Sequence, residues 1–86
     1  MMRENVTINM DRGVDARPAA MLVQVANRYD SNLYMQIENK KVNLKSIMGV
    51  MTLVLDRGTE VVIEANGGDE EQAISGVGAF LKGIEQ

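Results

Sequence analysis

Apolar residues occupy every second position in three separate stretches of the chain. They are Val6, Ile8 and Met10 in the first, Leu33, Met35 and Ile37 in the second, and Val61, Ile63 and Ala65 in the third. A period of two is typical of a strand with one buried face, so the sequence predicts strands near 6–10, 33–38 and 61–65. A shorter run at 42–44 follows a polar turn at 38–41 and is predicted to form one more strand.

Two other stretches carry apolar residues at helical spacing. One helix is predicted from Ala19, Leu22, Val23 and Ala26, which stand at i, i+3, i+4 and i+7. Asp15 precedes this helix as a candidate N-cap, and Pro18 lies in the first turn, where its missing N–H costs little. The last helix is predicted to start near Asp69, at an acidic cluster that suits the positive end of a helix dipole. Its apolar face is predicted to contain Ala73, Val77, Phe80, Leu81 and Ile84.

The segment 46–55 reads Ser-Ile-Met-Gly-Val-Met-Thr-Leu-Val-Leu. Ser46 stands directly before an apolar run at helical spacing and is predicted to cap a short helix. On a helical wheel with about 100° per residue, the apolar side chains form two groups. Val50 and Leu53 form one group, Ile47, Met48 and Met51 form the other, and Val54 lies between them.

A short helix on a small domain has two arrangements open to it. In the first, the Val50 side, with Leu53 and Val54, faces the sheet, and Ile47, Met48 and Met51 remain in or near solvent as a contact surface. Methionine suits such a surface because its flexible thioether adapts to different partners. In the second, all of these residues belong to the core. The pattern alone does not choose between the two.

The predicted elements follow the order strand, helix, strand, strand, helix, strand, helix. Helices segregated over a largely antiparallel sheet define the α+β class. With 86 residues, the chain is predicted to form one domain, 1–86. No repeat, linker or low-complexity segment divides it.

The composition excludes several kinds of chemistry. The chain contains no cysteine and no histidine, so disulfides, thiolate nucleophiles, imidazole acid–base catalysis and the usual zinc sites are not expected. Neither a metal nor a cofactor is therefore predicted. No apolar run reaches the length of about 20 residues that a membrane helix needs, and no signal-peptide pattern is present at the start. The predicted location is the cytoplasm, without a membrane partner.

Charge is unevenly divided along the chain. The net charge is −3, which does not favour direct binding to nucleic acid. Residues 1–46 carry seven basic and five acidic side chains, and residues 47–86 carry two basic and seven acidic ones. The basic residues near 17, 28, 40, 41 and 45 are either a mildly basic face for a partner or ordinary surface scatter.

Two stretches resemble motifs of the HPr-like phosphocarrier family. Residues 13–20, Gly-Val-Asp-Ala-Arg-Pro-Ala-Ala, resemble the HPr active-site motif, in which a histidine stands at the position of Asp15. Residues 40–51, Lys-Lys-Val-Asn-Leu-Lys-Ser-Ile-Met-Gly-Val-Met, resemble the regulatory segment of HPr and of Crh-type (catabolite repression HPr-like) proteins. The resemblance implies the HPr fold, an open-faced sandwich of three helices on a four-stranded antiparallel sheet.

The resemblance also implies a function. Crh-type proteins lack the histidine and keep the serine, as this chain does, so the expected protein is a regulator of carbon catabolite repression and not an enzyme. HPr kinase/phosphorylase would modify Ser46, and a LacI-type catabolite repressor would bind the phosphorylated form as its corepressor. A homodimer is a further possibility for this family. The expected partner-binding residues are Asp15, Arg17, Ala20, Lys45, Ile47, Met48, Gly49 and Met51.

Three residues keep open alternatives at this stage. Ser46 is either a helix cap alone or also a phosphorylation site. Asp15 is an N-cap paired with Arg17, a permanent mimic of the phosphorylated carrier, or an acyl-phosphate acceptor. In the last case the chain would be a variant phosphocarrier of the sugar phosphotransferase system. Arg17 is either a solvated first-turn residue or a partner contact beside the phosphorylation site.

Overall fold

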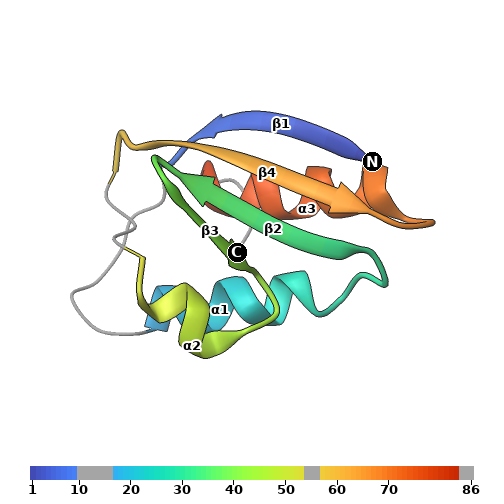
Figure 1. Ribbon diagram of the computed structural model, residues 1–86, viewed down its shortest axis with the longest axis horizontal. Coiled ribbons are helices and arrows are strands. Elements are labelled where there is room, and N and C mark those ends of the chain that lie inside the picture. The colour runs from blue at the N-terminus through green and yellow to red at the C-terminus, as the bar shows by residue number, and fades with distance from the viewer. Residues whose placement is uncertain (10–16, 54–56, 84–86) are drawn as a thin grey trace.

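The computed structural model describes residues 1–9, 17–53 and 57–83, without the side chains of Arg17 and Pro18. Figure 1 shows a single sheet with helices on one side of it. The elements are β1 (Met2–Thr7), α1 (Arg17–Ala26), β2 (Asn32–Ile37), β3 (Lys40–Asn43), α2 (Ile47–Met51), β4 (Glu60–Asn66) and α3 (Glu70–Leu81). The order predicted from the sequence and the α+β class are both confirmed.

The four strands form one antiparallel sheet in the order β1-β4-β2-β3. The register places Met35 opposite Ile63 on β4 and opposite Val42 on β3. The side chains on this inner face of the sheet pack against the helices. Helix α3 packs against both β1 and β4. The opposite face of the sheet carries no helix (Figure 1) and is largely polar within the described residues.

The core fills the space between the inner face of the sheet and the helices. Its largest fully buried side chains include Ile8, Leu22, Leu33, Met35, Leu44, Ile63 and Leu81. Burial of one such side chain contributes about 1.5–3 kcal/mol relative to full exposure. Aliphatic and methionine side chains make up most of the core, to which Phe80 also belongs.

The first strand lies earlier in the chain than the alternation predicts. β1 ends at Thr7, and Ile8, although fully buried, already follows the strand. The reason is that β1 is an edge strand paired along Met2–Thr7 with β4, and Arg3, Glu4 and Asn5 in its first half are exposed and polar, so they show no apolar alternation. β3 likewise starts at Lys40 and ends at Asn43, before the buried Leu44. Met10 lies outside the described residues.

The two later helices are shorter than the apolar pattern indicates. α2 ends at Met51 with Thr52 as its C-cap, so Leu53 lies beyond the helix, where it is partly buried. α3 ends at Leu81, and Gly83 follows with a positive φ of 79° that glycine adopts without strain. Val54 and Ile84 lie outside the described residues. None of the described helices is long and apolar enough to cross a membrane.

Gly76 allows a close approach between α3 and the end of α1. A Cβ atom at this position would overlap the hydroxyl oxygen of Tyr29. Gly76 therefore has a packing role that offsets the roughly 1 kcal/mol by which glycine weakens a helix relative to alanine.

The carboxylate of Asp69 fixes the connection between α1 and β2. It accepts hydrogen bonds from the backbone N–H of Asp30 and of Ser31, both at 2.9 Å, and from the Ser31 hydroxyl at 2.5 Å. Asp69 is the N-cap residue of α3, but its side chain makes no capping bond to that helix. The side chain thus joins two segments far apart in the sequence.

These bonds make the stability of the fold depend on acid pH. The Ser31 hydroxyl, followed by the backbone N–H of Asp30, holds the pKa of Asp69 below its ordinary value of 3.8. Because the unfolded chain binds this proton more readily, the stabilisation is present above pH 3.8 and is lost as the pH falls toward the lowered pKa. Asp69→Asn should therefore melt at a lower temperature at pH 7, and the difference from the parent protein should shrink below pH 3.8.

Thermal melting followed by circular dichroism between pH 7 and pH 2.5 measures this dependence. Glu71→Gln is the matched control, since it removes a neighbouring exposed carboxylate that makes no hydrogen bond or ion pair among the described residues. A gap between Asp69→Asn and the parent protein that stays constant across the range would contradict the prediction.

Candidate regulatory surface

Ser46 caps α2 in the way the sequence predicts. Its backbone is extended, with φ −106° and ψ 111°, and its hydroxyl oxygen accepts a hydrogen bond of 3.2 Å from the backbone N–H of Gly49. Its carbonyl oxygen accepts the first helical bond from Val50, at 3.0 Å. The serine is only half-buried, so it caps the helix while part of the residue remains exposed to solvent.

The loop before Ser46 is held by local hydrogen bonds. The side-chain oxygen of Asn43 accepts a bond of 2.8 Å from the backbone N–H of Lys45, and the Asn43 carbonyl accepts one of 3.1 Å from that of Ser46. Leu44 between them is fully buried and anchors the loop in the core. The position of Ser46 is therefore determined by the fold on both sides.

The structure separates the two apolar sides of α2. Val50 is fully buried, whereas Ile47, Met48 and Met51 are 39%, 77% and 55% exposed. The first of the two predicted arrangements is thus the correct one for these residues. We call Ser46, Ile47, Met48 and Met51 the α2 surface, because these residues present an apolar patch with a hydroxyl at its edge.

Gly49 follows Met48 on α2 and is half-buried. A Cβ atom there would meet Ser46 and Val42 only at ordinary contact distances of 3.5–3.7 Å. The fold itself therefore does not require a glycine at this position.

Lys45, a predicted partner contact, makes a bond within the fold. Its ammonium group donates a hydrogen bond of 2.6 Å to the carbonyl oxygen of Tyr29, beyond the end of α1. Lys40 makes a similar contact at the other end of α2, where it donates to the carbonyl oxygen of Thr52 at 3.3 Å. Both lysines therefore hold the α2 region against its neighbours as well as giving it positive charge.

The remaining predicted contacts belong to α1 and the segment before it. Ala20 is half-buried on α1, which packs against α2. Arg17 is the first residue of α1, but its side chain is not among those described, and Asp15 lies outside the described residues. The structure brings Ser46, Ile47, Met48, Gly49 and Met51 together and leaves the place of Asp15 and the Arg17 side chain untested.

Met21 is an exposed apolar residue that does not belong to the predicted partner contacts. It is 40% exposed on α1. The signal was present in the sequence, because Met21 lies off the apolar face defined by Ala19, Leu22 and Ala26. Among the described residues, no three histidine, cysteine, aspartate or glutamate side chains lie close enough to hold a metal ion.

The fold agrees with what comparison with known proteins shows. The family model described as "PTS HPr component phosphorylation site" matches residues 2–83. This match covers nearly the whole chain, and the chain therefore belongs to the HPr family of the sugar phosphotransferase system.

Within this family the chain is similar to Crh. The HPr-like protein Crh of Bacillus subtilis is 43% identical over 82 residues, which are 95% of this chain and 96% of Crh. The crystal structure of phosphocarrier protein HPr from Bacillus anthracis is 36% identical, with a TM-score of 0.86 over 93% of this chain and 95% of that one. A crystal structure of Bacillus subtilis Crh, described as a domain-swapped dimer, is 41% identical, with a TM-score of 0.77 over 100% of this chain and 99% of that one. The predicted family and the HPr fold are thus confirmed.

Proposed function

We propose that this chain is a regulatory protein of carbon catabolite repression that acts after phosphorylation on Ser46. HPr kinase/phosphorylase adds and removes the phosphate, and the phosphorylated form binds a LacI-type catabolite repressor. The observation that carries the proposal is the α2 surface, where a fixed, half-buried serine adjoins three exposed apolar side chains. The similarity to Crh along nearly the whole chain supports the same role.

The geometry explains how one modification can switch binding without a new fold. A phosphoserine carries about −1.5 to −2 charges at pH 7 and three strong acceptor oxygens. Placed at Ser46, these groups lie at the edge of the apolar patch, so a partner with both an apolar and a basic contact region recognises the phosphorylated form. Ile47, Met48 and Met51 supply the apolar contact, and the phosphate with Arg17 supplies the charge. DNA is contacted by the repressor and not by this chain.

The same chain is not expected to carry phosphate on histidine, because it contains none. Asp15 stands at the place that the family's motif gives to the phosphorylated histidine. An N-cap, a mimic of the charged carrier and an acyl-phosphate acceptor remain the three hypotheses for Asp15. Dimers of Crh support the formation of a homodimer by this chain as well. The cytoplasm remains the predicted location.

Labelling with two phosphoryl donors tests the proposal directly. ATP with HPr kinase/phosphorylase should label the parent protein on Ser46 and leave Ser46→Ala unlabelled. Phosphoenolpyruvate with the first enzyme of the phosphotransferase system should give no stable label, while Asp15→His is expected to regain some transfer. Mass spectrometry of the labelled peptides assigns the site. Label on Asp15 in the parent protein would favour the variant phosphocarrier instead, and no label on Ser46 would contradict the proposal.

A further inference from the structure

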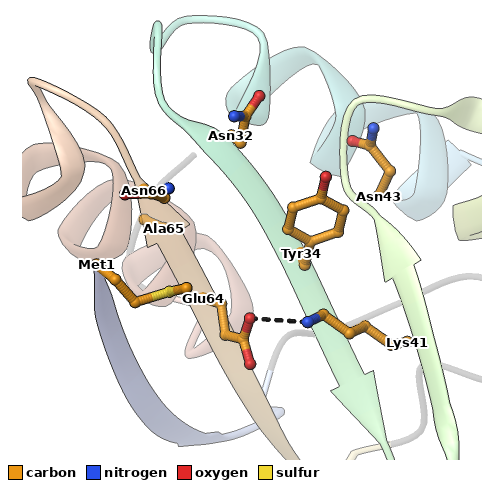
Figure 2. A pocket seen from close by; sticks show the side chains of 8 residues that line it. All are labelled: Met1, Asn32, Tyr34, Lys41, Asn43, Glu64, Ala65 and Asn66. Atoms are coloured by element: carbon orange, nitrogen blue, oxygen red, sulfur yellow. Dashed lines mark ion pairs between the residues drawn. The ribbon is translucent and has the colours of Figure 1, made fainter.

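The outer face of the sheet, opposite the helices, contains a hollow of about 500 Å³. Figure 2 shows side chains from β2, β3 and β4 converging around it. The strand register explains the convergence, since Asn32 lies opposite Asn66, and Tyr34 lies opposite Glu64 on one side and Asn43 on the other. Side chains at paired positions point to the same face of a sheet. The hollow is within the size range of small-molecule sites, about 300–1,000 Å³.

The two charged side chains that line this hollow, Glu64 and Lys41, are paired with each other. The Glu64 side chain is only 9% exposed, and its carboxylate oxygens lie 3.0 Å from the Lys41 ammonium and 3.2 Å from Nε of Arg3, which lies outside the hollow. Lys41 also lies 5.3 Å from the centroid of the Tyr34 ring. An anionic ligand would have to compete with Glu64 for these cations, and a cationic ligand would compete with them for Glu64. The hollow therefore favours a ligand without charge.

Uncommitted amide groups lie around the Glu64–Lys41 ion pair. Within the described part of the chain, the side chains of Asn32 and Asn66 have no hydrogen-bond partner. Asn43 uses its side-chain oxygen for the Lys45 N–H and keeps its NH₂ group available. Each amide offers donors and an acceptor, which is the pattern that a hydroxyl group satisfies from both sides. The half-buried Tyr34 ring beside them supplies an apolar surface for ring C–H groups.

We propose that this hollow binds an uncharged, polyhydroxylated ring of monosaccharide size. The hydroxyl groups bond to the amides of Asn32, Asn66 and Asn43, and the apolar side of the ring lies against Tyr34. The site lies on the face of the sheet opposite the helices and is independent of Ser46 phosphorylation.

Titration of the ¹⁵N-labelled protein with methyl β-D-glucopyranoside, followed by NMR, tests this site. Saturable shifts are expected at the side-chain amide signals of Asn32 and Asn66, with a Kd on the order of 1 mM. Loss of one neutral hydrogen bond in Asn66→Ala should weaken binding roughly two- to tenfold. Gln36→Ala is the matched control, because Gln36 lies on β2 with the same outward orientation as Tyr34 but outside the hollow. It should leave the affinity unchanged.

Three results would overturn the proposal. The first is the absence of saturable shifts up to concentrations on the order of 100 mM, far above the expected Kd. The second is an Asn66→Ala protein that keeps the parent backbone spectrum and binds the glycoside with full affinity. The third is inorganic phosphate shifting the same amide signals more strongly than the glycoside, which would identify an anion site. All three results are measured on this protein without a partner bound to the α2 surface, so they do not depend on the proposed function.

Discussion

Phosphorylation of Ser46 is expected to raise the affinity for a LacI-type repressor at least tenfold. A phosphate that faces basic side chains of a partner forms one to three charge-assisted hydrogen bonds. Each contributes about 1.5–3 kcal/mol, and about 1.4 kcal/mol corresponds to a factor of ten in Kd. Isothermal titration calorimetry with the phosphorylated and unmodified protein measures the difference. The backbone should change little, because the loop before Ser46 and the start of α2 are fixed by hydrogen bonds in the unmodified protein.

Two substitutions of Ser46 and one control substitution accompany this measurement. Ser46→Ala loses the capping bond to Gly49, so it should fold with a stability lower by about 0.5–2 kcal/mol and fail to bind the repressor. Ser75→Ala is the matched control, since it removes an exposed hydroxyl from α3 that makes no bond among the described residues. Ser46→Asp should replace the phosphate poorly, since a carboxylate lacks the third oxygen and the second charge. If the phosphorylated, unmodified and alanine forms bound the repressor with equal affinity, Ser46 would be a helix cap only.

Met48→Glu should abolish binding to the kinase and the repressor while leaving the fold intact. Met48 is 77% exposed, so a charge at this position stays hydrated in the free protein, and stability should change by no more than about 0.5 kcal/mol. In a complex the same charge would be buried against an apolar partner surface without a counter-charge, which is strongly unfavourable. Binding calorimetry and thermal melting measure the two effects separately. Gln72→Glu on α3 adds the same charge at another exposed position and should bind normally.

The buried residue Leu44, in the loop before Ser46, should show the opposite pattern, in which truncation has a large effect on stability. Leu44 is fully buried, and Leu44→Ala should lower the free energy of unfolding by about 2–5 kcal/mol. Met48→Ala should cost far less in the same chemical denaturation experiment. If Met48→Ala instead destabilised the protein as much as Leu44→Ala, Met48 would belong to the core and the α2 surface would be misplaced.

The sequence by itself determined the kind and order of the elements. Alternating apolar positions around Leu33, Met35 and Ile63 have the strand period, and each of these residues is buried in the sheet. The serine before the apolar run at 47–51 indicated a cap, and the observed bond to Gly49 confirms it. Two motifs at 13–20 and 40–51 were sufficient to recognise the family. These features depend on neighbours in the chain, which is why local patterns reveal them.

Only the tertiary structure decided where the elements end and which side of α2 is buried. β1 is defined by its pairing with β4, so the alternation around Val6 and Ile8 misplaced its end. Val50 is buried and Met48 is exposed because α2 packs against α1 and β3 on one side. A helical wheel groups the side chains of a helix, but it does not show which group faces the rest of the protein.

The outer face of the sheet shows the same dependence on distant residues. Asn32 and Asn66 are adjacent because β2 and β4 pair in one register, and Glu64 bridges Arg3 and Lys41 because β4 lies between β1 and β2 while β3 follows at the edge. No spacing in the sequence encodes these contacts, since strand order is set by burial of the whole inner face at once. The side chain of Asp69 likewise reaches Ser31 across the fold, where local pattern indicated only the start of a helix.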